Sequence, residues 1–153
     1  MGTPLEILVQ EAKNSGLNVS FSNDVRVNAD EFVYMEQDCT AFLDEIISMQ
    51  RQAQAIANRE KWGLGETTEG LTSATTLVSW FRGKAGNTGS ATDSDNNVND
   101  ILQQHYAIVV DIRDIHREIA QRYMAQDQDF AARYNELSAN VPPSAIGSTE
   151  AKA

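Results

Sequence analysis

The first half of the chain carries eight apolar side chains at alternating steps of three and four residues. They are Phe32, Met35, Cys39, Phe42, Ile46, Met49, Ala53 and Ile56. This spacing repeats every seven residues, which places all eight on one stripe of a single long helix. Neither Gly nor Pro interrupts residues 29–61. The sequence therefore predicts a helix over about residues 29–62, with Asn28 as its N-cap.

Two further helical segments follow a break at Gly63 and Gly65. The shorter is expected over residues 69–83, where apolar side chains again lie three and four residues apart. The longer is expected over residues 98–139 and ends before two prolines. Its apolar stripe consists of Ile101, His105, Ile108, Ile112, Ile115 and Ile119.

The strand signal is nearly absent, so the sequence predicts an all-α fold. Two long amphipathic helices in succession favour an antiparallel hairpin, here with an inserted short helix. We expect a partly flexible leader over residues 1–27, the hairpin domain over 28–140, a flexible loop at 86–97 and a disordered tail at 141–153. An isolated hairpin leaves part of each apolar stripe in water. We therefore expect a four-helix bundle formed with a second copy or with a related helical hairpin.

Charge and composition exclude several classes of partner. The chain of 153 residues has 12 basic and 22 acidic residues and a net charge of −10, which disfavours nucleic acids and anionic membrane surfaces. No stretch approaches the ~18 apolar residues that a membrane span needs. The first residues have neither the basic region nor the apolar run of a signal peptide. We expect a protein that stays in the cytoplasm or leaves it without a cleaved signal peptide.

The residues that usually carry chemistry are sparse. His105 and His116 are eleven residues apart, about 16 Å along a helix, and neither follows a Glu at the spacing of a bundle metal site. We interpret His105 as a core or interface residue and His116 as part of a solvated face. Cys39, the only cysteine, is interpreted as a small buried apolar residue. The sequence predicts no enzyme, no metal site and no cofactor.

Two motifs flank the inserted helix. Trp62-Gly63-Leu64-Gly65 follows the first long helix, and Tyr123 and Asp127 stand in a Tyr-x-x-x-Asp arrangement on the last one. With these motifs the chain resembles the Esx-like Trp-x-Gly (WXG) superfamily of type VII secretion substrates in actinobacteria and Gram-positive bacteria. It looks like an elongated member, because residues 66–97 lengthen the connection between the two long helices. It departs from the family pattern at Leu64, which stands where the family has its glycine.

The resemblance implies a secreted or cell-envelope protein without catalytic activity, made of helical hairpins that pair into four-helix bundles. It implies that Trp62, Gly63 and Gly65 form the turn, and that Tyr123 and Asp127 form the export signal. The implied partners are a second hairpin and a secretion ATPase or chaperone.

Three alternatives remain open at this point. Tyr123 and Asp127 are four residues apart and would share one helical face as a docking patch, yet Tyr123 also lies on the apolar stripe and would serve equally as core. A cytoplasmic helical adaptor or chaperone-like subunit is the alternative function. Trp80 and Phe81 form either a buried face of the short helix or an exposed patch, and we favour packing against the end of the hairpin.

Overall fold

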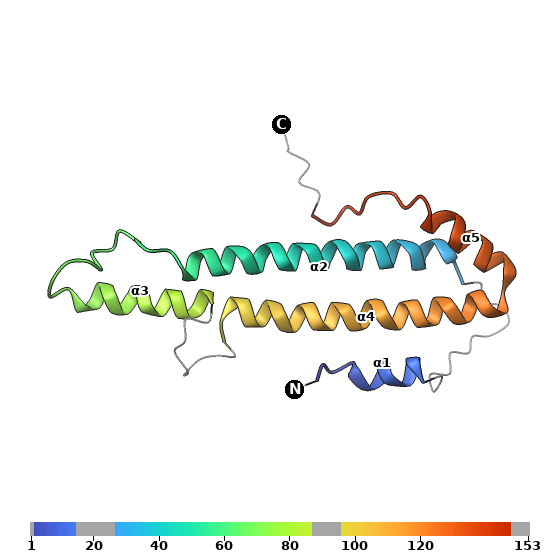
Figure 1. The fold of residues 1–153 in the computed structure, drawn as a ribbon, viewed down its shortest axis with the longest axis horizontal. Helices are drawn as coiled ribbons and strands as arrows, with labels where there is room; N and C mark the ends of the chain where they lie inside the picture. The colour runs from blue at the N-terminus through green and yellow to red at the C-terminus, as the bar shows by residue number, and fades with distance from the viewer. Residues whose placement is uncertain (1, 15–26, 87–95, 148–153) are drawn as a thin grey trace. The chain divides into compact units, whose positions relative to one another are not determined.

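A computed structural model describes residues 2–14, 27–86 and 96–147 of the chain. Those residues form five α-helices and no β-strand, so the predicted all-α class is confirmed. None of these helices is long and apolar enough to cross a membrane. The helices are α1 (Glu6–Lys13), α2 (Ala29–Ala57), α3 (Thr72–Ala85), α4 (Val98–Gln126) and α5 (Gln128–Ser138), labelled in Figure 1.

The chain divides into two compact units. Unit 1 comprises Met1–Glu45 with Ala107–Ala153, and unit 2 comprises Ile46–Tyr106. Helices α2 and α4 each contribute to both units, while α1 and α5 belong to unit 1 and α3 to unit 2.

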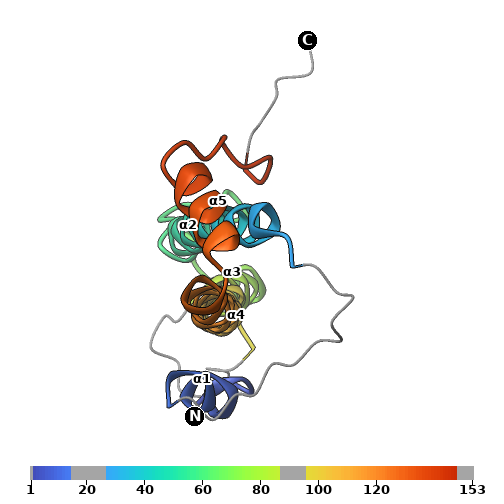
Figure 2. The same cartoon turned by 90° about the vertical axis from the view of Figure 1, so that its right-hand side faces the viewer.

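Within unit 1, α4 lies between α1 and α2 (Figures 1 and 2). Helix α1 is packed rather than loose, since Val9 and Ala12 are 6% and 1% exposed. Its end is held by Arg122, whose guanidinium donates a 2.6 Å hydrogen bond to the Ala12 carbonyl. Lys13 and Asp114 add an ion pair at 3.7 Å. The part of the expected leader that forms α1 is thus packed into unit 1.

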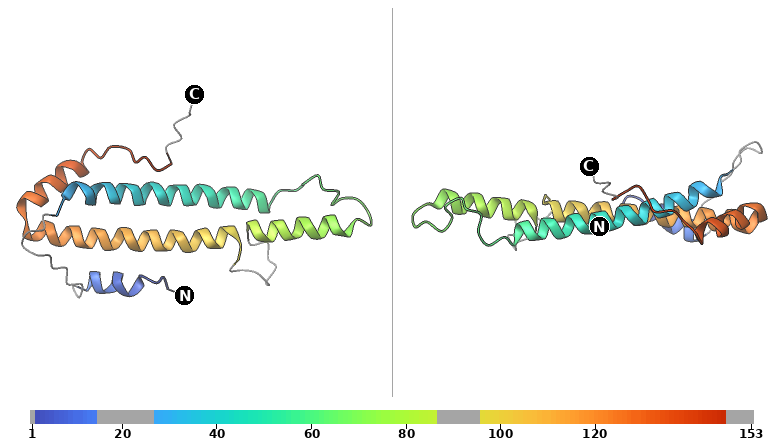
Figure 3. Two further views of the ribbon diagram at one scale, coloured as in Figure 1. Left: turned by 180° about the vertical axis from the view of Figure 1, so that it is seen from behind. Right: turned by 90° about the horizontal axis from the view of Figure 1, so that it is seen from above.

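Unit 2 is built from the end of α2, helix α3, the start of α4 and the connecting residues 58–71. The connection turns back, and α3 returns toward the start of α4 (Figure 3). The core uses mostly small side chains, and the chain at the end of α3 lies close to the end of α2, where a Cβ added at Gly86 would lie 3.2 Å from the Cβ of Ala57. The buried residues are Ile46, Ala53, Ala57, Ala74, Val78, Ala85, Gly86 and Asn97.

Helix α2 begins where expected, and the Asn28 side chain accepts a 3.1 Å hydrogen bond from the Asp30 amide. It ends at Ala57, five residues before the predicted end. One tertiary and one local contact hold the chain beyond this end. The Arg59 carbonyl accepts hydrogen bonds from the Arg82 guanidinium at 2.6 Å and from the Trp62 indole at 3.2 Å. Both donors are side chains, so this carbonyl has partners other than a backbone amide of a continuing helix. Arg82 comes 23 residues later in the sequence, so no local pattern contains this information.

The predicted helix over residues 98–139 is wrong in one respect, because it is two helices. Asp127 has extended backbone angles, φ −128° and ψ 110°, and separates α4 from α5. Its carboxylate accepts hydrogen bonds from the amides of Asp129 at 2.9 Å and Phe130 at 3.0 Å. Asp127 is therefore the N-cap of α5, a position that aspartate strongly favours.

The apolar stripe of α2 is divided by burial into two sets, each with a spacing of seven. One set is buried or half-buried: Phe32, Cys39, Ile46 and Ala53. The other set is exposed by 38–48%: Met35, Phe42, Met49 and Ile56. On α4 the predicted residues Ile108, Ile112, Ile115 and Ile119 are all half-buried.

Several predicted features lie wholly or partly outside the described residues. These are residues 15–26 of the leader, 87–95 of the loop and 148–153 of the tail. The described tail residues 141–147 lie near α2, where the Ser144 hydroxyl donates a hydrogen bond to Asp38.

Candidate functional site

The ring of Tyr123 is part of an aromatic cluster in unit 1. Its centroid lies 5.5 Å from that of Phe130 and 6.3 Å from that of Phe32. Phe130 also contacts Phe32 edge-on at 5.8 Å and is only 6% exposed. Burial raises the pKa of the Tyr123 hydroxyl above its ordinary value. Tyr123 therefore helps to hold α4 against α2 and α5.

Tyr123 and Asp127 line the same open depression of about 490 Å³. Asp127 does not continue the helix of Tyr123, so the expectation of one shared helical face is corrected. The two residues still stay close, because the Asp127 amide donates a 2.8 Å hydrogen bond to the Tyr123 carbonyl. The other residues that line the depression are Val27, Asn28, Ala29, Asp129, Phe130 and Arg133.

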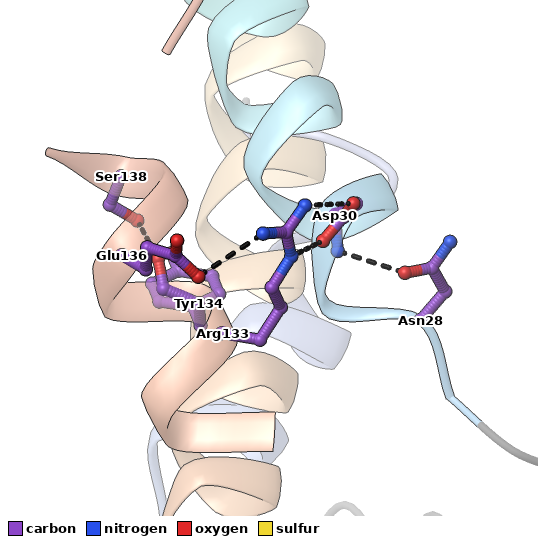
Figure 4. Close-up of polar contacts among 6 residues, drawn as sticks. All are labelled: Asn28, Asp30, Arg133, Tyr134, Glu136 and Ser138. Atoms are coloured by element: carbon purple, nitrogen blue, oxygen red, sulfur yellow. Dashed lines mark hydrogen bonds and ion pairs between the residues drawn. The ribbon is translucent and has the colours of Figure 1, made fainter. Parts of the chain in front are cut away.

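One basic side chain lines this depression, and it is already engaged. Arg133 forms a bidentate pair with Asp30, at 2.6 Å from Nε and 2.8 Å from Nη2, and its Nη1 lies 3.1 Å from Glu136 (Figure 4). This pairing lowers the pKa of Asp30 and raises that of Arg133. Asp127 and Asp129 are exposed carboxylates on the same depression. The lining thus offers negative charge beside an aromatic ring.

A second polar network connects the helices of unit 1. Glu36 accepts a 2.6 Å hydrogen bond from Arg117 and a 3.0 Å bond from the Tyr134 hydroxyl. Burial, together with the bond to Glu36, raises the pKa of Tyr134 to about 12. The Ser138 hydroxyl in turn donates to the Tyr134 carbonyl at 2.7 Å (Figure 4). Sequence reasoning missed these residues, because Glu36 lies 81 and 98 positions from its two partners.

The Trp62 turn is organised by a carboxylate that the sequence analysis did not single out. Glu66 accepts hydrogen bonds from the amides of Trp62 at 2.5 Å, Leu64 at 2.9 Å and Gly63 at 3.2 Å. These amide contacts, that of Trp62 first, lower the pKa of Glu66 to about 2. Gly63 and Gly65 have φ of 76° and 88°, a region that favours glycine.

Trp62 and Trp80 have opposite surroundings within unit 2. Trp62 stacks on Phe81 with centroids 5.9 Å apart, and the Arg59 guanidinium lies 5.9 Å from the centroid of its ring. Trp80 is 67% exposed, and Phe81 remains 45% exposed in spite of its stacking. The favoured expectation that Trp80 and Phe81 are buried is therefore wrong for Trp80 and only partly right for Phe81.

The two histidines exchange the surroundings expected of them. His105 is exposed in unit 2, so it is not a core residue there. His116 is half-buried 5.9 Å from Phe32, and burial lowers its pKa. Cys39 is half-buried, and burial raises the pKa of its thiol. Among the described residues, no group of three or more His, Cys, Asp or Glu side chains is arranged to hold a metal ion.

Comparisons with protein-family models, with curated proteins and with solved structures found no match to this chain. The resemblance to Esx-like proteins therefore depends on the motifs at Trp62 and Tyr123 and on the order of the helices. The geometry defines an all-α protein with a negatively charged aromatic depression in unit 1 and an exposed tryptophan in unit 2.

Proposed function

We propose that this chain is a non-catalytic helical interaction protein exported by a type VII (Esx-like) secretion system. One observation carries the proposal: Tyr123 and Asp127 line one open depression although a helix ends between them. An aromatic ring beside exposed carboxylates is suited to an Arg or Lys side chain of a secretion ATPase or chaperone. The protein would reach the medium or the cell envelope without a cleaved signal peptide.

The proposal includes a helical hairpin that dimerises into a four-helix bundle. Its support is the exposed set on α2, with Met35 and Phe42 in unit 1 and Met49 and Ile56 in unit 2. The spacing of seven gives these side chains the same side of one helix. Covering the 38–48% of each side chain that is still exposed would contribute roughly 0.5–1.5 kcal/mol, a share of the value for full burial. The partner is a second copy or a related hairpin.

A cytoplasmic helical adaptor or chaperone-like subunit is the second candidate. The observation that favours it is the internal use of both motif residues. Tyr123 packs in the aromatic cluster, and Asp127 caps α5. Packing explains a tyrosine at position 123, and capping explains an aspartate at position 127, so neither residue type requires a receptor.

Fractionation of the native host tests the first candidate against the second. Culture filtrate and cell lysate are compared by immunoblot for wild type, Tyr123→Ala and Tyr106→Ala, with a cytoplasmic marker for lysis. Tyr106 is a matched control, since it is a half-buried tyrosine of α4 that does not line the depression.

Export predicts wild type and Tyr106→Ala in the filtrate, while Tyr123→Ala accumulates in the cells as a folded protein. Equal retention of all three proteins in the lysate supports the adaptor.

A further inference from the structure

Helix α3 packs with its small side chains and exposes its large ones. Ala74, Val78 and Ala85 are buried in unit 2. The exposed residues are Leu71, which precedes the helix, and Leu77, Trp80 and Phe81 within it, and these four are named the α3 patch. Their exposed fractions run from 42% for Leu71 and Leu77 to 67% for Trp80. An amphipathic helix normally buries its large apolar side chains, so the α3 patch is the reverse of the usual arrangement.

The charge of the stretch of sequence that contains the α3 patch is also the reverse of that of the whole chain. Residues 51–86 hold five of the 12 basic residues but only three of the 22 acidic ones. Helix α3 itself contains Arg82 and Lys84 and no acidic residue. Lys84 follows Trp80 by four positions and so shares its side of the helix. One of the three acidic groups, the Glu66 carboxylate, accepts hydrogen bonds from three backbone amides.

The net charge of −10 therefore does not represent residues 51–86, which carry more basic than acidic side chains. Charges separated by more than the Debye length, about 10 Å at 0.1 M salt, are largely screened from one another. This locally positive charge is complementary to an anionic surface.

We propose that the α3 patch docks onto an anionic membrane surface. Exposed Trp, Phe and Leu with a Lys on the same side of the helix are residue types that interfacial helices use. The indole N–H of Trp80 makes no hydrogen bond to the described residues, which leaves it available to the hydrated headgroup region.

The shape of the surface favours a membrane over a protein. A depression of about 370 Å³ in unit 2 is lined by Thr75, Val78, Ser79 and Arg82 of α3, together with Glu60 and Glu66. None of these is a residue of the α3 patch. The helical spacing sets Trp80 on a different side of α3 from Val78 and Arg82. The α3 patch therefore lies outside this depression, and a fluid lipid surface accommodates its exposed apolar side chains without a shaped cleft.

The test uses the fluorescence of Trp80 in a Trp62→Phe background, which keeps a ring against Phe81 and leaves one tryptophan. The full chain is mixed with vesicles of phosphatidylcholine containing phosphatidylglycerol, and with vesicles of phosphatidylcholine alone. We expect a blue shift and quenching by brominated lipid with the anionic vesicles, both weakening as salt is raised.

Variants of the otherwise wild-type chain are compared by co-sedimentation with the same vesicles. Trp80→Ser is expected to lower binding about tenfold or more, because it removes a large apolar side chain. Lys61→Glu, an exposed position in the net positive stretch, lowers binding in a salt-dependent way. Ile7→Ser is the matched control, since Ile7 is 72% exposed in unit 1, and it leaves binding unchanged.

Four results would overturn the proposal. They are the absence of a spectral shift with anionic vesicles, equal binding of Trp80→Ser and wild type, and loss of binding in Ile7→Ser to the same degree. The fourth is a concentration-dependent shift without lipid, which would assign the α3 patch to a second copy of the chain. Circular dichroism confirms that each variant keeps its helices.

Discussion

The aromatic cluster of unit 1 and the α3 patch of unit 2 use similar side chains in opposite ways. In unit 1, Phe130 is 6% exposed and contacts Phe32, Tyr123 and Tyr134. In unit 2, Trp80 is 67% exposed, while alanines and a valine form the buried face of its helix. The first region is built to hold helices together, and the second presents large apolar side chains to whatever lies outside the chain.

The ionic contacts differ in the same sense. In unit 1, Arg133 and Arg117 pair with the carboxylates of Asp30 and Glu36 on another helix. In unit 2, Arg82 donates instead to the carbonyls of Arg59 and Glu60. Side-chain pairs thus connect the helices of unit 1, whereas backbone contacts define the connecting residues of unit 2.

The largest expected difference is in stability. Phe130→Ala removes a buried ring and should lower the free energy of unfolding by about 3–5 kcal/mol. Trp80→Ala should change it by about 0.5 kcal/mol or less, since that side chain is mostly exposed. Denaturation in urea followed by circular dichroism measures both. Similar losses in the two variants would contradict the contrast between the cluster and the α3 patch.

A smaller effect is expected at the junction of α4 and α5. Asp127→Ala removes the N-cap and should cost about 1 kcal/mol, whereas Asp127→Asn keeps a capping oxygen and should cost a few tenths or less. Thermal unfolding of both variants against wild type measures the difference. If Asn were as destabilising as Ala, charge rather than capping would govern this junction.

The sequence predicted most of the helices and little of what ends them. The heptad spacing placed α2, Asn28 marked its start, and the start expected at residue 98 is that of α4. The end of α2 depends on Arg82, which is distant in sequence. The break at Asp127 did have a local signal, an N-cap residue, but the continuing apolar pattern concealed it.

The candidate site was predicted in part for the same reasons. Tyr123 and Asp127 were recognised from their spacing, and both line the depression. The pair of Asp30 with Arg133 and the hydrogen bond from Tyr134 to Glu36 each join residues about 100 positions apart, which a single sequence does not reveal. Periodicity also did not show which residues of the α2 stripe are covered, because burial depends on the neighbouring helices.

Alkaline pH should weaken unit 1 through Tyr134. Its pKa is raised from 10.0 to about 12 in the folded state, so the stabilisation is fully present below pH 10 and is lost as the pH rises through about 12. The free energy of unfolding is measured between pH 9 and 12 for wild type and for Tyr134→Phe, and the difference between the two gives the pH dependence that is due to Tyr134. A Tyr134→Phe variant with the same decline over this range would assign the effect to other groups.

The smallest expected effect is local, at the Glu66 turn. The pKa of Glu66 is lowered from 4.5 to about 2 by its contacts with the backbone amides of the turn. The stabilisation of the turn by these contacts is therefore present above pH 4.5 and is lost as the pH falls toward 2. In a Trp80→Phe background, Trp62 fluorescence should change over this range, and Glu66→Gln should remove that change. The unfolding midpoint at neutral pH should barely move in Glu66→Gln. A large shift of that midpoint would show that the turn stabilises the whole unit.

The export of the two Asp127 variants tests the central claim most directly. Asp127→Asn keeps the cap of α5 but removes the negative charge from the depression, and Asp127→Ala removes both. The ratio of filtrate to lysate is measured for each in the native host, beside wild type. If a receptor reads this depression, export falls in both variants while Asp127→Asn keeps its stability. Normal export of Asp127→Asn, with a defect only in Asp127→Ala, would show that Asp127 serves the fold alone.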